Sequence, residues 1–135
     1  MLAVSAYTPE YITTCRTRIA NHITTYHAVH AAAPNSDAMA AFEPVFFNNL
    51  LLALEMSFVH RLRAKEKKDC NPLTEVRFLA TSLLTNDGVF TVTGMKWTPT
   101  TSTLGYTEGD PITIREPAFQ ALATAFFTDL TTKYA

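Results

Sequence analysis

The chain has 135 residues, of which 47% are hydrophobic and 17% are charged, with 11 Lys and Arg against 12 Asp and Glu. This length fits a single domain, 1–135, and the composition excludes an intrinsically disordered or collagen-like protein. The net charge of −1 provides no overall attraction toward nucleic acid or a membrane surface, so we expect neither partner.

The cysteines and the N-terminal residues predict a cytoplasmic protein. Cys15 and Cys70 are too few for a disulfide framework and lack metal-ligand spacing, so both are expected to be reduced thiols. Residues 1–6 lack the positive charge and long apolar run of a signal peptide. The longest apolar stretch, 45–59, is interrupted by amide and carboxylate side chains and is shorter than the roughly 20 residues of a transmembrane helix.

The first predicted element is a helix over about 9–33. Thr8 is a suitable N-cap, Pro9 fits the first helical position, and Glu10 favours the positive end of the helix dipole. Apolar residues then recur at spacings of three and four, which predicts a seam that packs against another helix. The seam comprises Ile12, Cys15, Ile19, His22, Tyr26, Val29 and Ala33.

The second predicted helix begins at Pro44 and continues to about Lys67, with 38–43 forming at most a short extra turn before it. It is apolar nearly all the way round, which is typical of a central helix covered on several sides. Because three short neighbours give such a helix little cover, a homodimer that shares it is an alternative arrangement.

A third helix is predicted over about 71–86 and a fourth from Glu116 to the C-terminus. Between them, the β-branched runs 89–93 and 112–114 predict two strands, joined by a long loop. The expected fold is therefore mainly α, a four-helix bundle-like domain with a small β-hairpin inserted before the last helix.

Glu55 is the most informative residue for a site. It is the only ionisable group from Pro44 to Val59, and a carboxylate on a central helix must be paired, hydrogen-bonded or kept neutral by a raised pKa. Asn48 lies near it on the helix surface, so one stripe carries an amide and a carboxylate among aliphatic side chains.

His22, Tyr26 and His30 lie four residues apart, which places them along one line of the first helix, within its apolar seam. Both imidazoles are therefore expected to face inward. If the first two helices pair antiparallel about a turn near residues 38–39, His22 lies level with Glu55. We therefore predict a contact between these two side chains.

Two explanations fit this set of residues. One is a polar pocket inside the bundle, with the carboxylate and the imidazoles as bases, ligands or proton carriers. The simpler one is a buried pair that satisfies its own hydrogen bonds, for which Arg16 or Arg18 is an alternative partner. No His-Glu-x-x-His or Glu-x-x-His motif is present, so no metal site is predicted and no cofactor is assigned.

The basic segment 61–69 holds five positive and two negative charges. An anion site beside Asn71, at the start of the third helix, is one explanation. The simpler one is that these cations complement the end of the second helix and keep a loop soluble. His60 and Arg63 share the arc of Glu55, so a polar groove toward the third helix is also expected.

The preferred function is a small intracellular binding or interaction domain, as a homodimer and with a small-molecule ligand in the bundle. The alternative is a metal-dependent or acid/base enzyme that uses Glu55 and inward-facing histidines; the sequence does not decide whether the protein is an enzyme. The candidate ligand-binding residues are His22, Tyr26, His30, Asn48, Glu55, His60 and Arg63.

Overall fold

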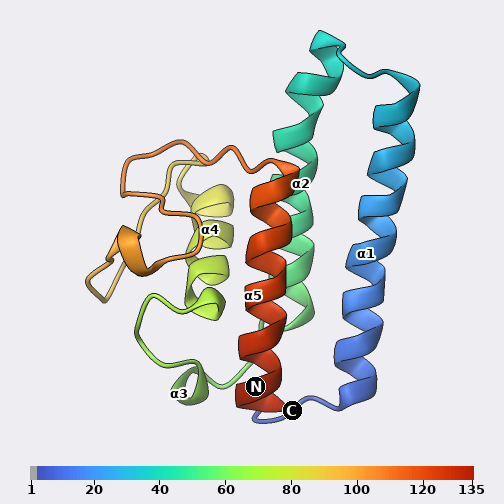
Figure 1. Ribbon diagram of the computed structural model, residues 1–135. Coiled ribbons are helices and arrows are strands. Elements are labelled where there is room, and N and C mark those ends of the chain that lie inside the picture. The colour runs from blue at the N-terminus through green and yellow to red at the C-terminus, as the bar shows by residue number, and fades with distance from the viewer. Residues whose placement is uncertain (1–2) are drawn as a thin grey trace.

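The computed structural model describes residues 3–135 and is mainly helical (Figure 1). Its helices are α1 (Pro9–Ala32), α2 (Asp37–Ser57), α3 (Arg63–Glu66), α4 (Pro72–Thr85) and α5 (Glu116–Tyr134), with a short 3-10 turn, η1 (Pro99–Thr101). Helix α2 contacts α1, α4 and α5, and α5 contacts all the other helices. The mainly helical fold with compact helix packing is thus confirmed. Within residues 3–135, no helix is both long and apolar enough to cross a membrane.

Helices α1 and α5 form as their sequences predict. Thr8 caps α1, because its Oγ1 accepts a hydrogen bond from Tyr11 N at 3.1 Å. One apolar stripe of α5, with residues at spacings of three and four, is entirely buried. It consists of Phe119, Leu122, Phe126, Leu130 and Tyr134.

The prediction that Pro44 begins the second helix is wrong, because α2 runs unbroken through it from Asp37. A proline inside a helix leaves the carbonyl four residues earlier without its N–H partner. Here that carbonyl belongs to Ala40, and Arg115 Nη1 donates to it at 3.3 Å. A donor from a distant part of the chain therefore compensates for the proline, and 38–43 is part of α2.

The predicted end of this helix is also wrong, because α2 stops at Ser57 rather than near Lys67. The segment that follows forms a parallel β-bridge between Val4 and Arg61. Val4 N donates to the His60 carbonyl at 2.8 Å as part of this pairing. The bridge requires extended backbone, which is incompatible with a continuing helix. The chain therefore leaves the helical path after Ser57 and folds back toward the core.

The predicted β-hairpin is not present. Among residues 3–135 no strand forms. An isolated antiparallel bridge pairs Val89 with Pro111, and Ile112 N donates to the Gly88 carbonyl at 2.8 Å, but no ladder joins 89–93 to 112–114. The turn before it is as expected, since Gly88 has a φ of 74°.

Side chains form hydrogen bonds with the backbone N–H and carbonyl groups that a longer β-ladder would pair with each other. Asn48 on α2 donates to the Ile112 carbonyl and accepts from Ile114 N, both at 3.0 Å. Thr91 N donates to Ser82 Oγ at 3.0 Å. Each of the two short segments is therefore attached to a helix by a side chain, in place of a longer β-ladder between them.

The long connection after α4 is ordered by hydrogen bonds from side chains of its own and of α4. Trp97 Nε1 donates to the Tyr106 carbonyl at 3.1 Å. The buried Glu75 carboxylate accepts from the N–H groups of Thr103 and Leu104, both at 2.8 Å. Burial raises the pKa of Glu75, and these two hydrogen bonds oppose the rise.

Candidate functional site

Glu55 is buried and paired, as the sequence predicts, but its partner is Arg61 and not His22. Arg61 Nη1 lies 2.9 Å from Glu55 Oε1. Burial raises the pKa of Glu55, and the charge and hydrogen bond of Arg61 oppose that rise. The carboxylate is therefore part of a polar cluster at the end of α2.

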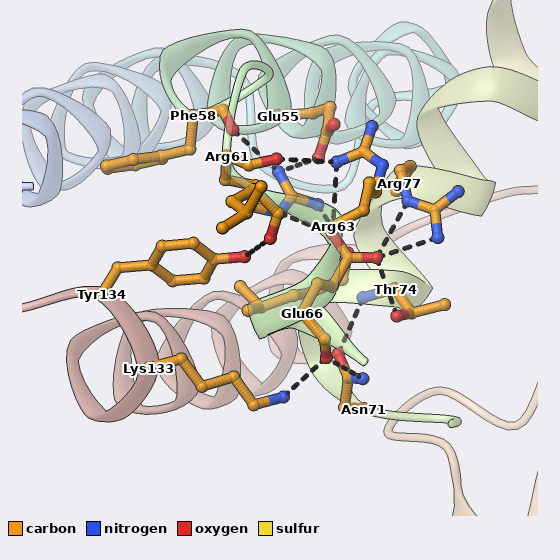
Figure 2. A network of polar contacts seen from close by, with 12 residues as sticks. Glu55, Phe58, Arg61, Arg63, Glu66, Asn71, Thr74, Arg77, Lys133 and Tyr134 are labelled. Carbon is orange, nitrogen blue, oxygen red and sulfur yellow. Dashed lines mark hydrogen bonds and ion pairs between the residues drawn. The ribbon is translucent and has the colours of Figure 1, made fainter. Parts of the chain in front are cut away.

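Arg61 is the centre of this cluster and is fully buried (Figure 2). Its Nε donates to Glu66 Oε1 at 2.8 Å, and its Nη2 donates to the Leu73 carbonyl at 2.9 Å. Its Nη1 also donates to the Phe58 carbonyl at 3.1 Å. Every nitrogen of the guanidinium therefore has a partner, which a buried charge requires.

Glu66, on α3, is the second buried carboxylate, and it collects donors from several elements. Besides Arg61, Arg77 approaches through Nε at 2.9 Å and Nη2 at 2.8 Å, and Thr74 Oγ1 donates at 2.9 Å. Arg63 Nη1 lies 3.4 Å away. Burial alone would raise the pKa of Glu66, but Arg61, Arg77 and Thr74 outweigh it and hold the pKa below its ordinary value.

The main chain around this cluster is tied to α4 and α5. The Glu66 carbonyl accepts from Asn71 Nδ2 and from Lys133 Nζ, both at 2.9 Å. Tyr134 donates to the Leu62 carbonyl at 2.6 Å. Figure 2 shows these contacts surrounding α3, so the short helix is held in place by its neighbours.

The prediction that two imidazoles face inward is wrong, because His22 and His30 are both exposed. His22 Nδ1 donates to the Arg18 carbonyl of its own helix at 2.7 Å. Its expected place in the core is taken by Ile23, since burying an unpaired imidazole costs free energy that an aliphatic side chain does not. The buried residues of α1 are Ile12, Cys15, Ile19, Ile23 and Tyr26.

Tyr26 and His30 are close together but lie away from the Arg61 cluster. Their ring centroids are 6.1 Å apart, and both line a hollow of about 530 Å³ that Glu55 does not line. His27 Nε2 lies 2.6 Å from Glu116 Oε2 in the same hollow. Gln120 Nε2 donates to the same carboxylate oxygen at 3.1 Å.

The other three candidates occupy separate places. The amide of Asn48 is used by the main chain of 112–114. The side chain of His60 is exposed. Only Arg63 joins the cluster that contains Glu55, through Glu66. The seven predicted residues therefore do not form one pocket.

Arg61 and Glu66 are the site residues that sequence reasoning missed. If α2 continued as predicted, Arg61 would lie on a different side of the helix from Glu55 and could not reach it. A signal was present nonetheless, because Arg61 is the arginine nearest in sequence to a carboxylate that needed a partner. A helix end between the two residues allows the chain to fold back.

Helix α2 also presents a long exposed face that has no charge. Its exposed residues include Val45 and Met56, which are 58% and 67% exposed, and Phe42, which is 40% exposed. We define the α2 face as these three residues together with Ala38, Ala41, Phe46, Asn49, Leu52 and Ala53. None of them is ionisable, whereas the charged residues of α2 lie elsewhere on the helix.

Comparison with known proteins gives no match: no family model, no curated protein and no solved structure is similar to this chain. Within residues 3–135, no three His, Cys, Asp or Glu side chains are grouped in a way that could hold a metal ion.

Proposed function

We propose that this protein is a small intracellular interaction domain that forms a homodimer through the α2 face. The observation that supports this proposal is the absence of any ionisable side chain among the nine residues of the α2 face, on a helix of 21 residues. Exposed apolar surface of this extent, rather than scattered single residues, is typical of an interaction site. A surface without charge meets no like-charge repulsion when it pairs with itself.

The order of residues on the α2 face favours a second copy of the same chain as the partner. The part of the face from Phe42 to Met56 is symmetric about Asn49, because reversing the helix direction exchanges Phe42 with Met56 and Val45 with Ala53. An antiparallel twofold pair therefore places each large side chain against a complementary one, including a sulfur–aromatic contact. The Asn49 amides then meet at the axis, where a polar pair specifies the register.

The expected interface is modest in size. Helix α2 is about 30 Å long, and one helix face of this length lies at the lower end of the range of stable interfaces. We therefore expect a dissociation constant in the micromolar range. Two unpaired cysteines, one of them buried, support the intracellular location.

Sedimentation of the wild type and of Val45→Lys tests the dimer. The wild type should sediment as a dimer at micromolar concentration, and Val45→Lys should be a monomer with an unchanged circular dichroism spectrum. Thr132→Lys, at an exposed position on α5, makes the same change away from the α2 face and should remain dimeric. A wild type that stays monomeric throughout the micromolar range would overturn the proposal.

Cysteine cross-linking tests the antiparallel register in a Cys70→Ser background. Asn49→Cys should form an intermolecular disulfide, because the twofold axis brings both copies of this position together. Met56→Cys should not cross-link to itself, although it should cross-link to Phe42→Cys in a mixture. Efficient self-linking of Met56→Cys would instead indicate a parallel pair and contradict this register.

A further inference from the structure

A cavity of about 190 Å³ lies on the outer side of the Glu66 cluster, away from the α2 face. It is bordered by α3, by one side of α4 and by the turn at 93–95. Its lining residues are Arg63, Glu66, Lys67, Lys68, Arg77, Phe78, Thr93, Gly94 and Met95. Figure 2 shows Arg63 and Arg77 side by side on one side of Glu66.

The lining of this cavity carries a net charge of three positive, from four cations and one carboxylate. The carboxylate, Glu66, is fully buried and already accepts from Arg61, Arg77 and Thr74. Its single negative charge offsets at most one of the four lining cations. Deeper in the cluster, Arg61 and Glu55 cancel each other's charge.

Several donors at the cavity have no partner within residues 3–135. Arg63 is bonded only through Nη1, at 3.4 Å to Glu66 and 3.5 Å to the Arg61 carbonyl, which leaves its Nε and Nη2 free. Arg77 uses Nε and Nη2, which leaves Nη1. Lys67 and Lys68 form no ion pair in this part of the chain. These donors point to an acceptor with several oxygens.

The pKa of Arg63 agrees with an excess of positive charge. Burial lowers this pKa, and although Glu66 raises it, repulsion from Arg77 and Arg61 lowers it further. An anion in the cavity would relieve this repulsion between the guanidinium groups.

The cavity also has an apolar wall and a defined size. The Phe78 ring is buried, and the Arg77 guanidinium lies 4.7 Å from its centroid, which fixes the arginine in place. Met95 is half-buried beside it. The volume corresponds to about six water molecules, which admits a tetrahedral anion but not a nucleotide.

We infer that this cavity binds a tetrahedral oxyanion, either free phosphate or the phosphoryl group of a small ester. Arg63 and Arg77 supply paired N–H donors to its oxygens, and Lys67 and Lys68 supply charge at the mouth. The site lies on a different surface from the proposed dimer interface, so each can fail without the other.

Titration with inorganic phosphate, at constant ionic strength and followed by NMR, tests the site. We expect saturable shifts of amides around the cavity, and Arg63→Gln should weaken binding by about tenfold or more. Arg63 is half-exposed and makes only long contacts, so this variant should fold. Lys68→Gln, which breaks no ion pair among residues 3–135, should also weaken binding and provides a second variant.

Lys65→Gln is the matched control, because it removes the same charge from the same short helix without touching the cavity. Its Nζ instead donates to the Ser5 carbonyl at 2.6 Å. Absence of saturation in the wild type, or equal weakening by Lys65→Gln and Arg63→Gln, would overturn the inference.

Phenyl phosphate distinguishes the two sources of the anion. Its ring can lie against Phe78 and Met95, so tighter binding than inorganic phosphate assigns the site to a small phosphate ester. Equal binding assigns it to free phosphate, and either result supports an oxyanion site.

Discussion

Glu66 is fully buried and ionised because its two oxygens meet donors from α3, α4 and the segment before them. Three arginines depend on it for neutralisation, and Arg61 among them is fully buried as well. In such a network, the removal of one member leaves the others desolvated and unpaired. The carboxylate therefore contributes more to the stability of the fold than any single hydrogen bond that it accepts.

Glu66→Gln should lower the free energy of unfolding by about 3–5 kcal/mol at neutral pH, because it removes one of the two carboxylates that pair with buried Arg61 and the one that pairs with Arg77. The lowered pKa of Glu66 also predicts the pH dependence. Its stabilisation is complete above the unfolded value near 4.5 and is lost as the pH falls through the lower folded value. Urea unfolding at neutral and acidic pH should show this loss in the wild type and less of it in the variant.

Glu55→Gln makes the same change at the neighbouring carboxylate and serves as the comparison. Burial raises the pKa of Glu55, so its contribution has the opposite sign and is lost as the pH rises through the folded value. This variant should therefore be less destabilised than Glu66→Gln at neutral pH. Equal losses of unfolding free energy in the two variants would contradict these roles of Glu55 and Glu66. So would a Glu66→Gln variant that loses as much stability at acidic pH as the wild type.

At the scale of the elements, the starts of α1, α4 and α5 could be predicted from the sequence, whereas both ends of α2 could not. Thr8-Pro9 and Asn71-Pro72 are local capping signals, and both helices begin where these signals stand. The end of α2 depends on pairing with Val4, and the lost hairpin depends on the amide of Asn48. Such contacts join residues far apart in the chain and leave no local pattern.

Asn48→Ala should lower the free energy of unfolding by about 1–3 kcal/mol, because it leaves two buried backbone groups without partners. These are the Ile112 carbonyl and the Ile114 N–H, both on residues that are almost fully buried. Hydrogen exchange at Ile114 should become faster, which locates the effect. Asn21→Ala, on the exposed surface of α1, should change stability by less than about 0.5 kcal/mol. Equal effects of the two substitutions would show that Asn48 does not hold this segment.

At the scale of the whole molecule, the two ends of the chain enclose the Arg61 cluster. Val4 bridges to Arg61, Tyr7 N donates to the Tyr134 carbonyl at 2.8 Å, and Lys133 reaches the Glu66 carbonyl. That Glu55 needed a buried partner followed from its isolation among apolar residues. Its partner was harder to predict, because Arg61 reaches it only where α2 ends at Ser57 and the following chain packs against residues near both termini.

The stability that Tyr134 gives to this packing of the chain ends should depend on pH in the alkaline range. Its side chain is almost fully buried and donates to the Leu62 carbonyl at 2.6 Å, and burial raises its pKa to about 12. The neutral hydroxyl therefore stabilises the fold fully below the unfolded value of 10.0, and this stabilisation is lost as the pH rises through about 12.

Tyr134→Phe should lower the free energy of unfolding by about 1 kcal/mol at neutral pH, because the Leu62 carbonyl loses its donor. Tyr7→Phe, whose hydroxyl has no hydrogen bond within residues 3–135, should cost less. Between pH 10.0 and about 12 the stability of the Tyr134→Phe variant should fall less steeply than that of the wild type, although other tyrosines with raised pKa values keep part of the slope. Urea unfolding across this range measures both effects. Parallel alkaline profiles for Tyr134→Phe and the wild type would mean that the closure by α5 does not depend on this hydroxyl, since only its ionisation distinguishes the two proteins there.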